Sequence, residues 1–430
     1  MQTEAIISLM PSFPQPAPYH DRLVEQHLDA LASELSAFSV VGPRAVGKTR
    51  TIERRAQTAV RLNVAAEAAA FQADPDAALV GLAEPVLLDE WQTVPNVLRA
   101  VANAVNEDPR PARFFLTGSA RAELENEPWP GTGRIQRIAM YPMTVGELQE
   151  HGKARFLDKL IEGEALVAPR SSLNIRDYLE LAVTGGFPRP ALELESARVR
   201  AAWFDSYIAD LLTHDVEQVE EPRTKRRDPI RMRRYFEAYA LNSAGVCDQK
   251  TIFDAAGVRK ETAAAYEELL ERLYVIEQVP AWMTNRLARL IHRPKRYVID
   301  AALMAHLLRL DLRGIMRDGD MLGRVLDAFV TAQLRPEVVV SQHRPRLFHL
   351  RTEGGRREVD LVVELGGNRV LGIEIKANAA PTATDARHLE WLRDQLGDRF
   401  VAGVVLHTGP RVFTISDRIT AAPISSIWTA

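Results

Sequence analysis

The most specific chemical signal in the chain is a glycine-rich segment that follows a short apolar run. It contains Gly42, Pro43, Arg44, Ala45, Val46, Gly47, Lys48 and Thr49, with Arg50 next. This spacing, GxxxxGK[ST], is typical of a phosphate-binding loop, in which glycines let the backbone amides point at the phosphates. Lys48 would neutralise the β- and γ-phosphates and Thr49 would bind Mg²⁺. The segment predicts a nucleotide site with Mg²⁺, and by itself it leaves both ATP and GTP open.

An acidic pair, Asp89 and Glu90, follows the apolar run that begins at Pro85. In nucleotide hydrolases, an Asp at this place holds Mg²⁺ and a neighbouring Glu polarises the attacking water. A small-molecule kinase would not need Glu90. The pair therefore favours nucleotide hydrolysis.

Two further side chains are weaker candidates for the same reaction. Thr117, near the end of the run 112–119, could sense the γ-phosphate, or it could belong to an ordinary turn. Arg134 could act as an arginine finger that reaches a neighbouring subunit, which would require an oligomer. In a chain this rich in arginine, a solvated surface residue is the alternative for Arg134.

Two runs of alternating polarity near the C-terminus predict a β-hairpin around the residues GGN. A turn centred on Gly367 places Asp360 opposite Glu374, and Lys376 on the same face. Two facing carboxylates repel each other unless a cation lies between them, so the hairpin predicts a second metal site, to which Asp327 would add an acid from the preceding helix. This pattern resembles the PD-(D/E)xK nuclease core. The alternative is a solvated hairpin whose carboxylates face water.

Lysine usage supports special roles for two of these positions. The chain has 46 Arg but only 8 Lys, so it uses arginine where any cation suffices. Lys48 and Lys376 lie where a compact point charge is preferred over a planar guanidinium.

The elements that position these residues form an α/β pattern in the first half. Apolar, partly β-branched runs predict strands of a parallel sheet covered on both faces. They lie at 37–42, 60–64, 85–90, 112–119 and 134–142. After Pro142 the pattern becomes largely helical to about Glu220.

Residues 231–280 predict a winged helix of three helices followed by a strand. Arg259 and Lys260, near the start of the third helix, and a basic run upstream favour DNA binding. Exposed Glu267, Glu268 and Glu271 on the same helix would repel phosphates. Winged helices also contact proteins, so DNA and a protein partner both remain open.

Charge differs between the two halves. The formal net charge is −3, but residues 1–220 carry about −10 and residues 221–430 about +7, much of it in the basic runs Arg223–Arg234, Arg286–Arg296 and Arg344–Arg357. No apolar run reaches the ~20 residues that cross a bilayer, and the N-terminal residues lack an export signal. With a single cysteine, Cys247, we expect a cytoplasmic protein without disulfides or membrane contact.

The phosphate loop, VLLDEWQTVP, RFFLTGS and GGFPRP together resemble a family of prokaryotic AAA-type ATPases whose C-terminal half is a domain of unknown function. The resemblance continues through SYIADLLTHDV, GRVLDAFVTAQL and REVDLVVE. It implies ATP and Mg²⁺ binding, and a helical lid after the core. Where the family usually carries Glu in the GRVLDAF helix, this chain has Asp327.

The sequence thus predicts four parts: an AAA-type P-loop ATPase core (1–145), a helical lid (146–220), a winged helix (221–285) and a nuclease-like α/β domain (286–430). ATP binding would order the lid and move the basic half, coupling hydrolysis to engagement of nucleic acid. The alternative is an ATP-dependent switch that binds a protein and carries a degenerate, non-cleaving nuclease-like domain.

Overall fold

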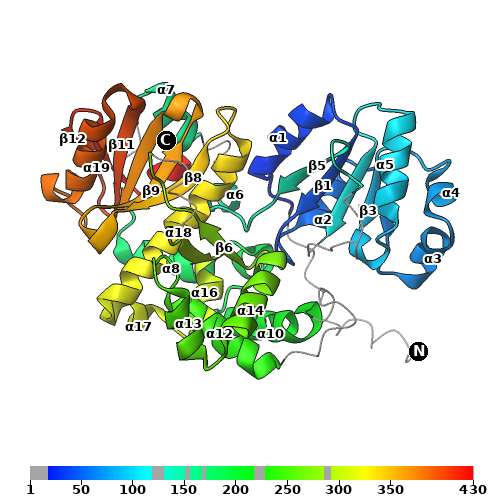
Figure 1. The fold of residues 1–430 in the computed structure, drawn as a ribbon, viewed down its shortest axis with the longest axis horizontal. Coiled ribbons are helices and arrows are strands. Elements are labelled where there is room, and N and C mark those ends of the chain that lie inside the picture. Colours follow the sequence, from blue (N-terminus) through cyan, green and yellow to red (C-terminus); the bar gives the residue numbers. More distant parts are fainter. Residues whose placement is uncertain are drawn as a thin grey trace, which may run out of the picture.

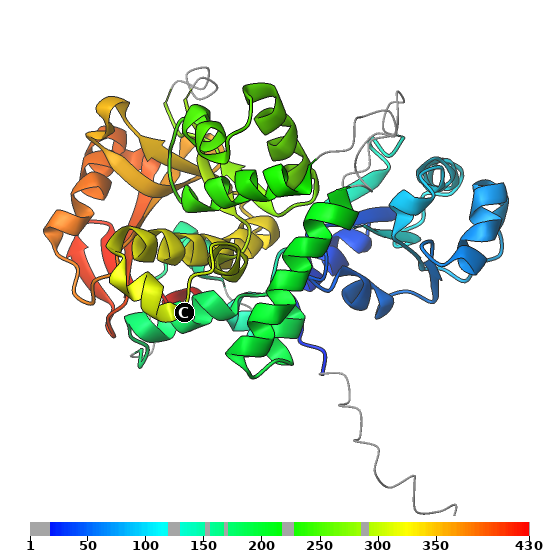
Figure 2. The ribbon, with the colours of Figure 1, turned by 90° about the horizontal axis from the view of Figure 1, so that it is seen from below.

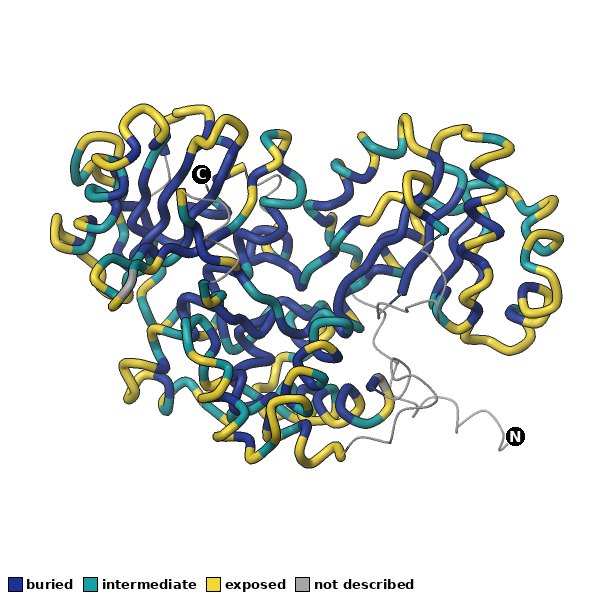
Figure 3. Tube along the Cα trace, viewed as in Figure 1, coloured by how far each residue is buried: buried dark blue, intermediate teal, exposed yellow. Residues whose placement is uncertain are grey.

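The computed structural model describes residues 18–118, 130–150, 155–166, 171–216, 228–284 and 292–429. Two β-sheets lie at opposite ends of the molecule, and helices lie between and below them (Figure 1). Buried residues run through both sheets and through the helices that separate them (Figure 3).

The first sheet has five parallel strands in the order β2-β3-β4-β1-β5. They are β1 (Ala37–Val41), β2 (Thr58–Arg61), β3 (Val86–Asp89), β4 (Phe114–Gly118) and β5 (Ile135–Ala139). Every residue of β1, β3 and β4 is buried, as expected for parallel strands covered by helices. The predicted α/β fold with a parallel sheet is confirmed for this part of the chain.

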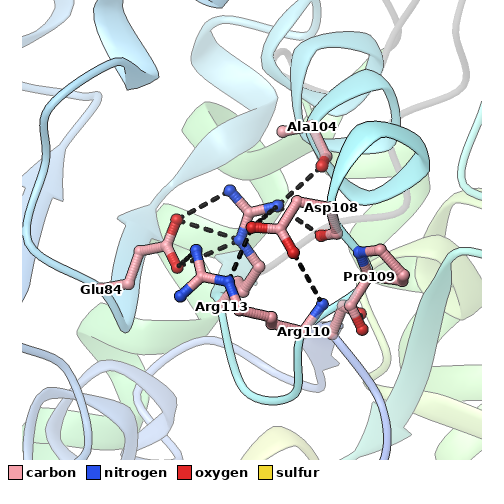
Figure 4. A network of polar contacts seen from close by, with 7 residues as sticks. Glu84, Ala104, Asp108, Pro109, Arg110 and Arg113 are labelled. Carbon is pink, nitrogen blue, oxygen red and sulfur yellow. Dashed lines mark hydrogen bonds and ion pairs between the residues drawn. The ribbon is translucent and has the colours of Figure 1, made fainter.

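A polar network lies at the end of this sheet where the strands begin (Figure 4). Arg113, just before β4, forms an ion pair with Glu84 at 2.8 Å and donates to the carbonyl oxygen of Ala104 at 2.7 Å. Ala104 belongs to α5 (Val97–Glu107). The network therefore holds this helix against the segments that precede β3 and β4. These segments lie at the end of the sheet opposite the phosphate-binding loop, which follows the last residue of β1.

The helices after β5 pack against the C-terminal half of the chain. They include α6 (Val145–Leu148), α7 (Phe156–Glu162), α8 (Ile175–Thr184) and α10 (Ala197–Asp210). Helix α8 contacts α16 (Ala301–Leu307) and α18 (Gly319–Val340), and α18 also contacts α1 (Leu23–Ala32). In Figure 2 the green helix α10 lies between the first sheet and the C-terminal half. The helical segment therefore connects the two ends of the molecule.

Three helices and a two-stranded sheet follow. The helices are α12 (Pro229–Leu241), α13 (Gln249–Ala256) and α14 (Lys260–Arg272), and β6 (Ile276–Val279) pairs antiparallel with β7 (Lys295–Val298). Because β7 lies beyond residue 285, this unit extends across the expected boundary between the third and fourth parts.

The second sheet has six strands in the order β12-β13-β11-β10-β9-β8. Its central hairpin joins β9 (Glu358–Glu364) to β10 (Val370–Ile375), and Val370 pairs with Glu364 and Ile373 with Leu361. This is the predicted register around Gly367. Helix α19 (Ala383–Leu396) packs on the sheet, contacting β10 and β11 (Phe400–His407).

Candidate functional site

The phosphate-binding loop links the end of β1 to α2 (Lys48–Glu53), and its two glycines are required by its shape. At Gly42, φ is +154° and a Cβ atom would lie 2.0 Å from the carbonyl oxygen of Met140. At Gly47, φ is +98°, a left-handed conformation that favours glycine. The loop therefore passes too close to the backbone before α6 for any side chain at Gly42.

Lys48 is buried and its ammonium lies inside the loop. Its Nζ atom donates to the carbonyl oxygen of Gly42 at 2.9 Å and to that of Pro43 at 2.7 Å. The ammonium is thus held at the centre of the loop, where a flexible lysine stem can redirect it to a phosphate.

Thr49, Asp89 and Thr117 come together beside the loop. The Thr49 hydroxyl donates to Asp89 Oδ1 at 2.8 Å, and the Thr117 hydroxyl donates to the same oxygen. Asp89 and Thr117 are adjacent because β3 and β4 pair in parallel at these residues. Oxygen ligands of this kind suit Mg²⁺, which usually takes one or two carboxylates and completes its shell with phosphate oxygens and water. These residues therefore fit a Mg²⁺ ion bound together with a nucleotide.

Glu90 directly follows β3 in a left-handed conformation, with φ of 53°. Its carboxylate is half-buried and accepts a hydrogen bond from the Gln92 side-chain amide. The other amide atom, Gln92 Oε1, is buried without a hydrogen-bond partner. Gln92, which the sequence did not single out, therefore orients Glu90 next to Asp89.

Arg22 is a second residue that the sequence did not reveal. Its side chain is buried and donates to the carbonyl oxygens of Val46 and Tyr141, both at 2.8 Å. It also forms an ion pair with Glu147 at 3.1 Å. Arg22 thus ties the phosphate-binding loop to α6, and no local motif predicts a contact over this sequence distance.

The remaining predicted residues lie around or away from this site. Ala45 is exposed at the tip of the loop, and the carbonyl oxygen of Arg44 accepts a hydrogen bond from the Tyr207 hydroxyl at 3.4 Å. Arg50 is exposed and lies 5.9 Å from the ring centroid of Tyr19.

Arg134 lies at the end of the first sheet where the strands begin, away from the phosphate-binding loop. It directly precedes β5, whose first residue pairs with the first residue of β1. Its Nε atom donates to Asn106 Oδ1 at 2.6 Å. A role toward a neighbouring subunit stays a prediction. Ser119, which ends the run containing Thr117, lies outside the described residues.

The C-terminal half brings the predicted acidic residues together. The Lys376 ammonium lies 2.7 Å from Glu374 Oε2, and Asp360 Oδ2 accepts from the backbone amide of Ile375 at 2.9 Å. Asp327, on α18, is buried. The sequence did not predict the residue between them: the Lys295 ammonium lies 2.5 Å from Asp327 Oδ2 and 3.6 Å from Asp360 Oδ1.

These charges shift one another's pKa. Burial opposes ionisation of Lys295, but Asp327 and Asp360 outweigh it, so the pKa of its ammonium lies well above the ordinary value. Burial and the charge of Asp360 raise the pKa of Glu374 well above its ordinary value, although Lys376 opposes them. Burial would raise the pKa of Asp360 too, but Lys295 and Lys376 lower it overall. The ammonium groups of Lys295 and Lys376 thus lie beside the three carboxylates as counter-charges.

A cavity of about 370 Å³ adjoins these residues. Its lining residues include Asp327, Asp360, Lys376, Cys247 and Arg324. Within the described ranges, no group of three or more His, Cys, Asp or Glu side chains is arranged to hold a metal ion.

Two expectations about the basic half need correction. Glu267 is not exposed on α14: it is buried and forms an ion pair with Arg296 at 3.3 Å. Lys295 and Arg296, which end the predicted basic run from Arg286, are also buried. Arg259 and Lys260 are exposed as expected, whereas 217–227 and 285–291, which hold much of the charge of the first two basic runs, lie outside the described residues.

Comparisons with known proteins agree with the first site. Residues 35–149 match an AAA domain. Residues 175–313 and 322–427 match two domains of unknown function, DUF8612 and DUF4143. The part of the chain that carries the phosphate-binding loop is thus similar to an AAA domain, which supports nucleotide binding. Among the described helices, none has both the length and the apolar character to span a membrane.

Two mycobacterial proteins are similar to this chain over most of its length. The uncharacterized protein Rv2008c of Mycobacterium tuberculosis is 27% identical over 397 residues, which cover 91% of this chain and 80% of the relative. The uncharacterized protein Mb2031c of Mycobacterium bovis gives the same values.

Among solved structures, the Walker-type ATPase PABY2304 of Pyrococcus abyssi is 14% identical, with a TM-score of 0.43 over 68% of this chain and 96% of that chain. A mutant of RuvB from Thermotoga maritima is 15% identical, with a TM-score of 0.28 over 67% of this chain and 94% of that chain.

Proposed function

We propose that the chain is a Mg²⁺-dependent ATPase that couples hydrolysis to engagement of nucleic acid by its C-terminal half. The observation that carries the enzymatic part is the hydrogen bond from Thr49 to Asp89 at 2.8 Å. It joins the phosphate-binding loop to the end of β3, directly before Glu90. The groups that would bind the nucleotide therefore lie next to the group that would hydrolyse it.

Each residue has a role that its chemistry supports. Mg²⁺ held by Thr49 and Asp89 would neutralise charge on the phosphates. Lys48 would turn from the loop carbonyls to the β- and γ-phosphates. Glu90 would accept a proton from the water that attacks the γ-phosphorus, and ADP and phosphate would leave. Gln92 would hold Glu90 in position for that water.

Coupling between ATP binding and the C-terminal half is supported by a series of contacts that begins at the phosphate-binding loop. Tyr207 on α10 donates to the loop carbonyl of Arg44. One turn earlier on α10, Phe204 stacks on His306 of α16, with ring centroids 4.4 Å apart. Movement of the loop on ATP binding would therefore act on α10, and through it on the helices of the C-terminal half.

The nucleic-acid part rests on the exposed Arg259 and Lys260 at the start of α14 and on the order of three helices followed by a hairpin, which is typical of a winged helix. The second candidate is a protein-binding switch with a non-cleaving C-terminal domain. The lysine contacts of Asp327 and Asp360 favour it, because they occupy the carboxylates that cleavage would need.

The test is release of phosphate from ATP by the purified full chain, with and without Mg²⁺ and with and without added DNA. The proposal expects Mg²⁺-dependent release that DNA changes. Release that DNA leaves unchanged, together with no detectable DNA binding, would leave the protein-binding switch as the function.

A further inference from the structure

Two of the carboxylates expected to hold a second metal ion, Asp327 and Asp360, already contact a lysine ammonium. Lys295 extends from β7, and its side chain is only 3% exposed. Its Nζ atom reaches Asp327 Oδ2 on α18 at 2.5 Å and Asp360 Oδ1 on β9 at 3.6 Å. It also donates to the main-chain oxygen of Asp360 at 3.3 Å. One ammonium thus joins three separate elements.

The other oxygens of Asp327 and Asp360 are directed at protein donors. Asp327 Oδ1 accepts from the Tyr297 hydroxyl at 2.9 Å and from the Thr331 hydroxyl at 3.2 Å. Asp360 Oδ2 accepts from a backbone amide. A Mg²⁺ ion requires several oxygens at about 2.0–2.1 Å in octahedral geometry. These oxygens cannot turn toward an ion unless they release their present partners.

The remaining acid, Glu374, is also engaged. Its Oε2 atom lies 2.7 Å from the Lys376 ammonium. Its Oε1 atom is buried and has no hydrogen-bond partner, and one free oxygen is too few for a divalent ion.

We propose that the Lys295 ammonium stands in the place of a divalent cation, so that the C-terminal carboxylate group is a metal-independent structural centre. An ammonium carries one positive charge and satisfies the facing carboxylates without open coordination positions. The centre then fastens β7, and with it the helices α12 to α14, to α18 and the β9–β10 hairpin. This inference does not depend on ATP hydrolysis, so its failure and that of the proposed function can be distinguished.

The experiment is a Mn²⁺ titration of the full chain, followed by the electron paramagnetic resonance signal of free Mn²⁺. All proteins carry Asp89→Asn, which removes the ion position at the phosphate-binding loop. The background protein, which carries Asp89→Asn alone, is expected to show no saturable Mn²⁺ site that depends on Asp360. Lys295→Ala is expected to gain one saturable Mn²⁺ site per chain, because removal of the ammonium leaves facing carboxylates without a counter-charge. Adding Asp360→Asn should abolish the gain.

Lys250→Ala, at an exposed lysine on α13, is the matched control and should gain nothing. Circular dichroism and size exclusion establish that each variant is folded, and Lys295→Gln replaces the alanine variant if that one unfolds. The proposal is overturned if the background protein binds an ion that Asp360→Asn releases. A folded Lys295 variant that gains no ion would overturn it as well.

Discussion

The hydroxyl of Thr49 donates a hydrogen bond to Asp89 Oδ1 at 2.8 Å, across 40 residues of sequence. This bond closes the candidate catalytic site, because it brings the end of the phosphate-binding loop against the end of β3. Pairing of β3 with β4 adds Thr117 to the same oxygen.

Thr49→Ala should therefore raise the Mg²⁺ concentration that supports half-maximal phosphate release, by roughly 10- to 100-fold. Thr49→Ser retains the hydroxyl and should restore most of the Mg²⁺ response. The measurement is phosphate release at fixed ATP over a Mg²⁺ series. An unchanged Mg²⁺ requirement in the alanine variant would contradict the role given to Thr49.

Arg22→Met should destabilise the protein. The substitution leaves Glu147 buried without its ion-pair partner, and breaking a buried pair in this way costs about 3–5 kcal/mol. The matched control is Arg54→Met, because the Arg54 side chain is 50% exposed and lies 3.8 Å from Asp21; its cost should stay below about 0.5 kcal/mol. The free energy of unfolding in urea measures both. Similar values for the two variants would mean that Arg22 does not fasten the loop to α6.

Glu337 predicts a pH dependence of stability. Burial raises the pKa of this carboxyl, on α18, to about 8. The folded state therefore binds a proton that the unfolded state has released above its ordinary pKa, so this contribution is present at low pH and is lost as pH rises toward 8. The slope approaches about 1.4 kcal/mol per pH unit between about pH 5 and pH 8.

Glu337→Gln should flatten that slope, because a neutral amide has no proton to lose. Urea unfolding at several pH values between about 5 and 8 measures the effect, with Glu193→Gln at a solvent-exposed site as the control. A slope that survives in Glu337→Gln would assign the pH dependence to other groups.

Nucleic-acid engagement predicts a steep dependence on salt. If basic side chains of the C-terminal half contact phosphates, released counterions drive the association, and affinity falls as salt rises. Replacing both Arg259 and Lys260 with Ala should weaken DNA binding. It should also reduce the slope of log affinity against log salt concentration by roughly one to two. Arg176→Ala, at an exposed residue on α8, is the control. Fluorescence anisotropy with labelled DNA over a salt series measures this, and no binding at low salt would remove DNA as the partner.

Local patterns predicted the parallel sheet of the first half and the register of the C-terminal hairpin. Buried parallel strands leave continuous apolar runs, and the hairpin register followed from period-2 alternation around Gly367, which has a φ of +73°. The contacts of Arg22 and Lys295 could not be predicted in this way, since their partners lie far along the chain. Lys295 looked like part of a basic surface run, and only the tertiary structure shows that its stem is buried beside Asp327.

The central claim is that binding and hydrolysis of ATP occur at one site with separable residues. The direct measurement is Mg²⁺-ATP affinity, by calorimetry, together with the rate of phosphate release for Lys48→Ala and Glu90→Gln. Lys48→Ala should abolish binding, because the loop loses its phosphate-neutralising charge. Glu90→Gln should bind ATP as the unsubstituted protein does but lose roughly 10²- to 10⁴-fold in rate, because only the attacking water loses its base. Equal loss of binding in both variants, or full activity in Glu90→Gln, would contradict the account.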